Sequence, residues 1–388
     1  MRWTKRAGIA AGVAAVLAAG AAGGEERPRI RQLGVRPGVL QPGPLNAITD
    51  VAGVRVGHRT IVRGSAVRTG VTAILPHGSD LFRLKTPAAV YVGNGFGKAA
   101  GFLQVAELGV IETPIVLTNT LSVGRAVEAV VAWTLAQPGN EEVRSVNAVV
   151  GETNDGYLND VRAFHVGRDD VFAAIAAASS GPVAEGSVGA GTGTSAFGWK
   201  GGIGTASRLL PAALGGFTVG VLVQANFGGV LVVDGVRVGE ALGRYSFRDQ
   251  LEPGPDGGGA EGDAGGGSCM IVVATDAPLT PRQLQRIARR AVLGLARVGS
   301  FMANGSGDFV IAFSTRNLVP HDAASSSRTV EVLHDAHLSP LFLATVEGVE
   351  EAVLNALTRA TTVRGRDGHL RRAIPIDDLK RVLAAAGR

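Results

Sequence analysis

The chain has 388 residues, of which 46% are hydrophobic and 18% charged, a composition typical of a large globular protein rather than a disordered one. Its formal charge of +5 comes mostly from arginines scattered along the chain, and no basic run is interleaved with aromatic residues, so the sequence does not favour a nucleic-acid partner. A single cysteine, Cys269, excludes an intrachain disulfide and a cysteine-rich zinc site.

The N-terminus has the pattern of an export signal. A positively charged start, Met1 to Arg6, precedes an apolar stretch of small residues, Ala7 to Gly23, with several alanines suited to signal cleavage. The stretch is short for a membrane span and poor in Leu, Ile and Phe, which disfavours a permanent anchor. We therefore expect residues 1–28 to be a signal peptide or disordered leader and the mature protein to be periplasmic or secreted. A cytoplasmic protein with an Ala/Gly-rich extension is the alternative.

Strand-like and helix-like runs alternate through the first half of the chain, which predicts an α/β protein. Ser122 precedes a run of small apolar residues and is expected to cap that helix at its N-terminus. The predicted strands lie within 45–61, 67–76, 88–97, 114–119 and 146–152, and the predicted helices are 98–108, 122–136 and 169–179.

The second half of the chain predicts an antiparallel or mixed sheet rather than a purely parallel one. A dense glycine and threonine stretch at 186–204 is followed by an apolar segment at 217–239, in which Val233 to Val236 has the pattern of a hairpin turn. We expect one domain over residues 29–388, with sheets covered by helices on both outer faces. The remaining predicted strands are 270–275, 309–315 and 329–333, and the remaining helices are 281–299, 339–359 and 377–386.

The glycine-rich motifs do not fit nucleotide-binding sites. Gly93 to Lys98 has the wrong spacing for a P-loop, and Gly202 to Ser207 has serine where the dinucleotide fingerprint needs its last glycine, so we expect both to be structural turns. The histidines are spread out, and His334 and His337 are expected to be solvated or packed rather than metal-bound. No GxSxG elbow occurs. The sequence predicts neither a metal nor an organic cofactor.

Ser268 stands where a polar loop, Glu252 to Gly267, meets a buried strand. Taken alone, this position favours an ordinary hydroxyl at the start of a strand. A cut just before Ser268 would give it a free α-amine beside its hydroxyl, which places a nucleophile and a general base in one residue. Polar residues also stand where other predicted strands meet loops, and such positions are where α/β proteins gather their sites. These residues are Tyr157, Asn226, Ser306 and Asp308.

Ten motifs occur in an order that resembles a known family. They are NAITDVAGVRVGH, RTGVTAILP, VGNGFGK, ELGVIETPIVLTNTLSVG, VVGETNDGYLND, GWKGGIGTASR, GVLVQANFG, SCMIVVATDAPL, ARRAVLGLARVGS and GSGDFVIAFST. From about Asn46 to the C-terminal helix the chain is similar to the DmpA/BapA family, the self-processing N-terminal-serine aminopeptidases of peptidase family S58. This family includes L-aminopeptidase D-amidase/D-esterases and β-peptidyl aminopeptidases.

The resemblance implies an αββα sandwich, similar to Ntn hydrolases with different connectivity, and a precursor that cuts itself between Gly267 and Ser268. The products would be an α chain of about 29–267 and a β chain of 268–388. The resemblance also implies a homo-oligomer, a tetramer or larger, that acts without a metal or cofactor on small peptides, amides or esters.

The resemblance assigns a role to each of the singled-out residues. Ser268 is the implied nucleophile with its own α-amine as general base, Asn226 the oxyanion donor, and Tyr157 a neighbour of the scissile group. Ser306 and Asp308 are implied to orient Ser268 and to bind the substrate ammonium. Some β-peptidyl members have glutamate in place of Asp308, so the preference among L, D and β residues stays open.

Two other functions remain as alternatives. Ornithine acetyltransferases have a related architecture and transfer acyl groups between amines, but their nucleophile is threonine. A non-catalytic periplasmic relative would bind peptides and keep an uncut chain.

Overall fold

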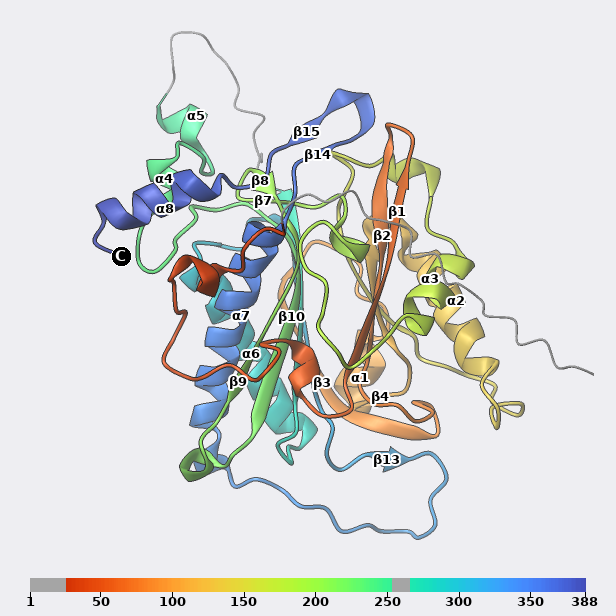
Figure 1. Ribbon diagram of the computed structural model, residues 1–388. Coiled ribbons are helices and arrows are strands. Elements are labelled where there is room, and N and C mark those ends of the chain that lie inside the picture. Colours follow the sequence, from red (N-terminus) through yellow and green to blue (C-terminus); the bar gives the residue numbers. More distant parts are fainter. Residues whose placement is uncertain (1–25, 253–265) are drawn as a thin grey trace, which may run out of the picture.

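The computed structural model describes residues 26–252 and 266–388. Two β-sheets lie face to face between two layers of helices, so the predicted αββα sandwich is confirmed (Figure 1). The strands are β1 (Arg55–Arg63), β2 (Val67–Leu75), β3 (Leu84–Gly95), β4 (Val110–Ile111), β5 (Ile115–Asn119), β6 (Val149–Thr153), β7 (Ser195–Ala196), β8 (Trp199–Lys200), β9 (Gly202–Leu209), β10 (Thr218–Asn226), β11 (Gly266–Thr275), β12 (Gly305–Ser314), β13 (Val319–Pro320), β14 (Val363–Arg364) and β15 (Leu370–Arg371). The α-helices are α1 (Phe102–Leu108), α2 (Val123–Leu135), α3 (Arg168–Ala176), α4 (Val238–Ala241), α5 (Arg248–Leu251), α6 (Pro281–Arg297), α7 (Ser339–Arg359) and α8 (Ile376–Ala385).

The smaller sheet has the order β1-β2-β5-β6, and helices α2 and α3 cover its outer face. The larger sheet runs β13-β3-β12-β11-β10-β9, with β4 beside β3, and α6 and α7 cover its outer face. In the larger sheet β11 pairs antiparallel with β10 and parallel with β12. The sheet is therefore mixed, as the sequence predicted, and β11 is one of its central strands.

Alternation along β11 divides its side chains between two cores. Met270 and Val272 join the core between the sheets, where they pack with Leu117 of the smaller sheet. Cys269 and Ile271 belong to the core beneath α6 and α7. We call these sides of the larger sheet the pocket face and the helix face. Adjacent residues of β11 therefore lie in different surroundings, one on the pocket face and the next on the helix face.

Close packing on the helix face depends on a small residue in β9. A Cβ added to Gly204 would lie 1.9 Å from the carbonyl oxygen of Ala352 in α7, a distance that no side chain tolerates. The glycine therefore lets α7 lie directly on the backbone of β9. Helix α7 matches its predicted range of 339–359 and contains a largely apolar sequence, as a helix buried on several sides requires.

Several local predictions from the sequence were wrong. The helix predicted from residue 98 begins at Phe102, because Gly101 has a φ of +85° and does not continue a helix. Ser122 makes no capping bond with its side chain; instead Asn119 accepts from the Ser122 N–H. Residues 329–333 form no strand, and 202–207 lie in β9 rather than in a turn. The predicted hairpin turn at 233–236 forms, but it closes a single bridge without flanking strands.

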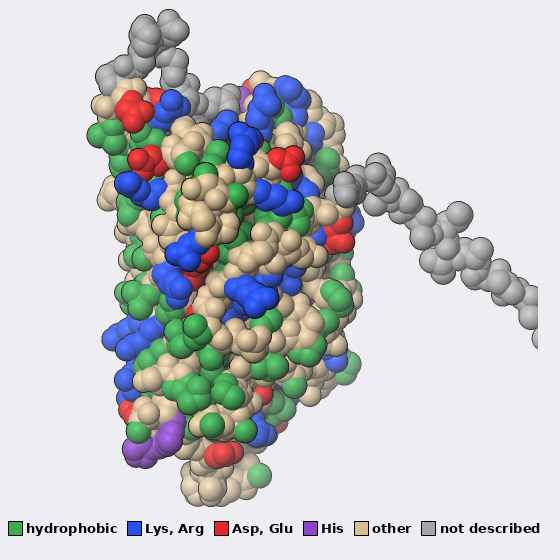
Figure 2. Space-filling view, turned by 60° about the vertical axis from the view of Figure 1, so that its left-hand side comes forward, with side chains coloured by type: hydrophobic (Ala, Val, Ile, Leu, Met, Phe, Trp, Pro, Cys, Tyr) green, Lys and Arg blue, Asp and Glu red, His purple; other side chains and the backbone are tan. Residues whose placement is uncertain are grey.

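On the face of the molecule that Figure 2 draws, the charged side chains are spread out. Figure 2 shows Lys and Arg side chains in separate groups, with Asp and Glu side chains among them, rather than one basic stripe. The signal-like segment lies almost wholly outside the described residues. Among the helices that the structure describes, none has the length and apolar character needed to cross a bilayer.

Candidate active site

Ser268 is the third residue of β11, and the strand runs unbroken through the predicted cut. Gly266, Gly267 and Ser268 pair with Gly305, Ser306 and Gly307 of β12. The Ser268 hydroxyl donates to the carbonyl oxygen of Gly267 at 2.5 Å, which places it beside the bond that the sequence predicts to be cut. Ser268 is buried and belongs to the pocket face, because its neighbour Cys269 belongs to the helix face.

Gly267 has no room for a side chain. A Cβ at this position would lie 2.8 Å from the Cα of Phe227 and 3.0 Å from the carbonyl oxygen of Asn226. The close approach of β10 therefore requires glycine immediately before Ser268. Because glycine has no side chain, residue 267 itself has nothing that hinders attack at its carbonyl carbon.

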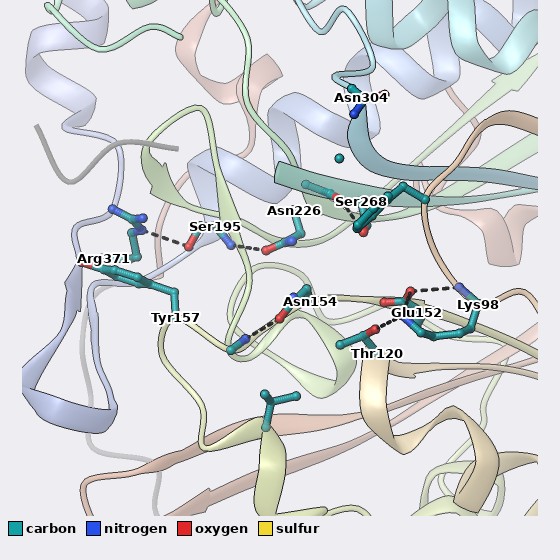
Figure 3. Close-up of a pocket in the computed structure, with 15 residues that line it drawn as sticks. Lys98, Thr120, Glu152, Asn154, Tyr157, Ser195, Asn226, Ser268, Asn304 and Arg371 are labelled. Carbon is teal, nitrogen blue, oxygen red and sulfur yellow. Dashed lines mark hydrogen bonds and ion pairs between the residues drawn. The ribbon is translucent and has the colours of Figure 1, made fainter. Parts of the chain in front are cut away.

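Asn226 lies directly across from Ser268, because the two residues are partners in the β10–β11 ladder. The Asn226 Oδ1 atom accepts a 2.8 Å hydrogen bond from the backbone N–H of Ser195. Since that N–H can only donate, the bond fixes which end of the amide is oxygen. The Nδ2 end is directed toward Ser268 (Figure 3). The structure thus presents an amide donor beside the serine hydroxyl.

A cavity of about 770 Å³ opens in front of these residues. It is large enough for a small peptide, and polar side chains line much of it. Tyr157, Asn226, Gly267 and Ser268, all singled out from the sequence, line it together. The other lining residues are Phe96, Lys98, Thr120, Glu152, Asn154, Gly156, Val161, Ser195, Asn304, Gly305 and Arg371.

Glu152 provides a buried carboxylate on one side of this cavity. It is the penultimate residue of β6, and its side chain is 2% exposed. Lys98 contacts it twice, through the backbone N–H at 3.1 Å and through the ammonium at 3.8 Å. Burial raises the pKa of Glu152, and the contacts with Lys98 oppose that rise. The second oxygen, Oε2, is itself buried and has no hydrogen-bond partner among the described residues, so the carboxylate keeps an unused acceptor beside the cavity.

Arg371 lies on the other side of the cavity, on the β14–β15 hairpin. Its Nε donates to the Ser195 hydroxyl at 3.0 Å. The guanidinium carbon lies 3.8 Å from the centre of the Tyr157 ring, within the range of a cation–π contact. The same ring stacks on His369 with centres 4.5 Å apart. Tyr157 is therefore held at the cavity wall by Arg371 of β15 and by His369, which immediately precedes that strand.

A buried lysine supports the loop that carries Ser195. Lys200 is fully buried, and its ammonium donates to the carbonyls of Gly191 and Gly201 at 2.8 Å each. Burial lowers the pKa of Lys200 to about 7, and the nearby Asp155 carboxyl opposes that shift. These bonds fix the backbone on both sides of Ser195. Through Ser195 they fix the orientation of the Asn226 amide.

Ser306 and Asp308 do not line the cavity. The β11–β12 register places Ser306 beside Gly267 and Asp308 beside Cys269, so both belong to the helix face. Apart from each other, the Ser306 hydroxyl and the Asp308 carboxylate have no hydrogen-bond partner within the described residues. Burial raises the pKa of Asp308 to about 6, and the neighbouring Ser306 hydroxyl partly opposes the rise. In the uncut chain both residues flank the backbone of Ser268 rather than its hydroxyl.

The sequence interpretation missed several polar residues of this cavity, among them Lys98, Glu152, Ser195 and Arg371. Glu152 lies next to the end of the strand that precedes Tyr157, so the rule that polar residues gather at strand ends pointed to it as well. Lys98 lies in a glycine-rich motif that was interpreted only as a turn. Arg371 had no local signal, because a distant hairpin brings it to the cavity.

The comparisons with known proteins agree with one another. Residues 46–371 match Peptidase family S58. The beta-peptidyl aminopeptidase BapA of Sphingosinicella microcystinivorans is 42% identical over 96% of this chain and 95% of that protein. The structure of a Burkholderia sp. beta-aminopeptidase is 42% identical, with a TM-score of 0.84 over 93% of this chain and 99% of that one. The L-aminopeptidase D-Ala-esterase/amidase of Ochrobactrum anthropi, described as a prototype for the serine aminopeptidases and a variant of the Ntn hydrolase fold, is 40% identical, with a TM-score of 0.84 over 93% of this chain and 99% of that one.

The fold is the variant of the Ntn hydrolase sandwich seen in that prototype, and the site presents a serine hydroxyl with an amide donor beside it. These features define a hydrolase with a serine nucleophile. The family match covers most of the chain, and the relatives are similar along nearly their whole length. The chain belongs to peptidase family S58, and it is a serine aminopeptidase.

Proposed function

We propose that the chain cuts itself between Gly267 and Ser268 and then removes N-terminal residues from small peptides, amides or esters, with Ser268 as nucleophile. The observation that carries the proposal is the 2.5 Å contact between the Ser268 hydroxyl and the Gly267 carbonyl oxygen. It places the hydroxyl within reach of the carbonyl carbon of the preceding residue. The α chain would end at Gly267, and the β chain would comprise residues 268–388.

Self-cleavage proceeds by an acyl shift. The Ser268 oxygen forms a bond to the Gly267 carbonyl carbon, the peptide C–N bond breaks, and the hydroxyl proton moves to the departing nitrogen. Water then hydrolyses the resulting ester, which leaves a carboxylate on Gly267 and restores the hydroxyl of Ser268. The nitrogen has become the α-amine of Ser268, and its usual pKa of about 8 suits a general base near neutral pH.

Turnover repeats this chemistry on a substrate. The α-amine accepts the proton of the Ser268 hydroxyl as the oxygen attacks the substrate carbonyl, and it then donates that proton to the leaving amine. The Asn226 Nδ2 stabilises the developing oxyanion, a contribution of about 3 kcal/mol for comparable donors. Water hydrolyses the acyl-enzyme.

The substrate ammonium is bound by Glu152. This carboxylate lines the cavity with an unpartnered oxygen, whereas Asp308 belongs to the helix face of the sheet. Asp308 and Ser306 lie beside the backbone of Ser268, where they orient the new α-amine. Two relatives are named for beta-peptidyl aminopeptidase and D-Ala-esterase/amidase activities. These activities set the range of acyl groups to be assayed.

Two further parts of the proposal concern the whole protein. Residues 1–28 act as a signal peptide or leader, so residues 29–388 form the exported catalytic domain. The processed protein assembles into a homo-oligomer, a tetramer or larger. Exposed apolar side chains on α1 and just before it support such an assembly: Phe96, Leu103 and Leu108 are 67%, 90% and 61% exposed. Light scattering on the processed protein measures its mass directly.

Intact-mass spectrometry tests the cut. Purified protein should separate into two chains, the smaller starting at Ser268, and should hydrolyse amino-acid p-nitroanilides. A single uncut chain without that activity would overturn the proposal. A cut at any other bond would mean that Ser268 does not become the N-terminal nucleophile.

A further inference from the structure

Two residues of opposite charge line the same end of the cavity. Lys98 and Glu152 lie together there, and Arg371 lies at the other end (Figure 3). A peptide bound for removal of its first residue carries its ammonium on the acyl side of the scissile carbonyl. Because Glu152 takes that ammonium in the proposed function, this end of the cavity receives the N-terminal residue of the substrate.

The Lys98 ammonium has donors to spare at this end. Its side chain is 55% exposed. The ammonium donates to the Thr120 hydroxyl at 2.8 Å, which is its only hydrogen bond within the part of the chain that the structure describes. The ammonium lies 3.8 Å from Glu152 Oε1, beyond hydrogen-bond length, so that contact is Coulombic. An ammonium has three N–H donors, so two remain for a ligand in the cavity that Lys98 lines.

The charge balance of this end is incomplete when the substrate brings only a cation. A substrate ammonium at Glu152 also lies near the Lys98 ammonium, because both approach the same carboxylate. Two like charges that share one counter-ion repel each other, and the partial exposure of Lys98 screens that repulsion only in part. A substrate carboxylate next to Lys98 would offset the repulsion, because four charges of alternating sign would then lie side by side.

We propose that Lys98 binds a carboxylate on the N-terminal residue of the substrate, beside the ammonium at Glu152, so that the preferred substrates begin with an aspartyl residue whose amine and second carboxyl group are free. Of the two common acidic residues, aspartate holds its ammonium and side-chain carboxylate closer together, which suits two protein charges only 3.8 Å apart. The residue can be linked through its α- or its β-carbonyl. This inference rests on the proposed function, because it needs Ser268 as the nucleophile and Glu152 at the ammonium.

The test uses pairs of p-nitroanilides that differ by one carboxylate, on protein that has been cut. The β-linked pair is aspartic acid β-p-nitroanilide and β-alanine p-nitroanilide, and the α-linked pair is aspartic acid α-p-nitroanilide and asparagine p-nitroanilide. In at least one pair the wild-type protein should favour the carboxylate by about fivefold in kcat/KM, the upper range for an ion pair with a half-exposed cation. The pair with the larger ratio identifies the linkage.

Lys98→Met removes the ammonium and keeps the backbone N–H that contacts Glu152. The ratio should fall to one or below, because the substrate carboxylate then faces Glu152 without a cation. The substrate without the carboxylate should be hydrolysed at least as well as by the wild type, since no side chain competes for Glu152; a merely structural role would slow both substrates together. Lys98→Arg should restore most of the ratio. A ratio that keeps its wild-type value in Lys98→Met overturns the inference.

A control and a second measurement complete the test. Arg162→Gln changes an exposed arginine next to the lining residue Val161 and should keep the wild-type ratios. Aspartate should inhibit the wild-type protein at a concentration about fivefold below that needed for β-alanine, and equal inhibition would contradict a carboxylate site at Lys98. Hydrolysis of the neutral anilides with both wild-type ratios near one removes only this inference, whereas no hydrolysis of any anilide removes the proposed function.

Discussion

Ser268 and Cys269 are adjacent residues on one strand, yet their surroundings differ completely. Ser268 faces a polar cavity, with an amide opposite and a backbone carbonyl 2.5 Å from its hydroxyl. Cys269 faces the core beneath α6, where burial raises the pKa of its thiol well above the usual value, with the Asp308 carboxyl adding to the rise. The intrinsically stronger nucleophile is thus kept protonated. The face of the strand, rather than the reactivity of the side chain, decides which residue reacts.

The largest effect is expected at Ser268 itself. Ser268→Ala removes the attacking oxygen for both the cut and the turnover, so the chain should stay whole and hydrolysis should fall by about 10³-fold or more. Ser268→Thr, which keeps a hydroxyl, should retain some cleavage. Mass spectrometry and a p-nitroanilide assay measure the two steps separately. If the Ser268→Ala protein were still cut, another residue would have to be the nucleophile.

On the same face, Asn226 should rank second. Asn226→Asp keeps the oxygen that accepts from Ser195 but replaces the donor with a negative oxygen, so kcat should fall by about 10²- to 10³-fold. Asn226→Ala removes both ends of the amide and disturbs Ser195 as well. If Asn226→Asp retained normal kcat on protein already cut, Asn226 would not donate to the oxyanion.

Glu152→Gln tests the ammonium site on the pocket face. The substitution keeps the shape but loses the charge, so KM for substrates with a free amine should rise by roughly 10-fold or more, with a smaller change in kcat. Glu107→Gln, an exposed change on α1, is the matched control. Discrimination between a free amine and its N-acetyl derivative should also weaken. If the discrimination between the free amine and its N-acetyl derivative stayed unchanged, Glu152 would not bind the substrate ammonium.

On the helix face, Asp308 should affect stability through pH. Its folded-state pKa of about 6 lies above the usual value, so ionisation costs stability as the pH rises through 6. In the uncut Ser268→Ala chain, Asp308→Asn should raise the free energy of unfolding at pH 8, by at most about 3 kcal/mol. The gain should shrink as the pH is lowered towards 4. Urea unfolding at the two pH values measures it, and a gain that grows at low pH would reverse the assignment.

Cys269→Ala should have the smallest effect. The change leaves a small cavity beneath α6 and should cost about 1 kcal/mol of stability. Cleavage and turnover should stay within about twofold of wild type, because the thiol belongs to the other face. Loss of cleavage in this variant would break the contrast between the two faces.

Much of the fold was predictable because its elements carry strong local patterns. The α7 helix has a long apolar sequence and was placed with its observed bounds. The β-branched run of β11 was predicted as a strand, but β11 begins at Gly266, within the predicted loop and before the predicted start at Met270. The wrong predictions fell where tertiary contacts decide. Residues 329–333 have strand propensity but no neighbouring strand to pair with. Ser122 occupies the N-cap position of α2 without a side-chain bond, because a 3₁₀ turn precedes the helix and Asn119 caps that turn.

The site was predictable only in part. Ser268, Asn226 and Tyr157 came from strand ends and family resemblance, and the structure brings them to one cavity. The side on which Ser306 and Asp308 lie depends on the register of β12 against β11, which no local pattern sets. Arg371 is separated by more than two hundred residues from Tyr157, the residue that its guanidinium contacts. Such a pairing follows from topology alone.

The two residue pairs that precede Ser268 in the β11–β12 ladder have a consequence for the timing of maturation. Gly266 and Gly267 stay paired with Gly305 and Ser306 after the bond is broken, because the pairing does not depend on that bond. The new chain end at Gly267 would then stay at the cavity that this residue lines until it separates from β12. With the proposed cut after Gly267, maturation would have two stages, a chemical one and a release, and both would occur within one molecule. Dilution should therefore leave the lag before activity unchanged.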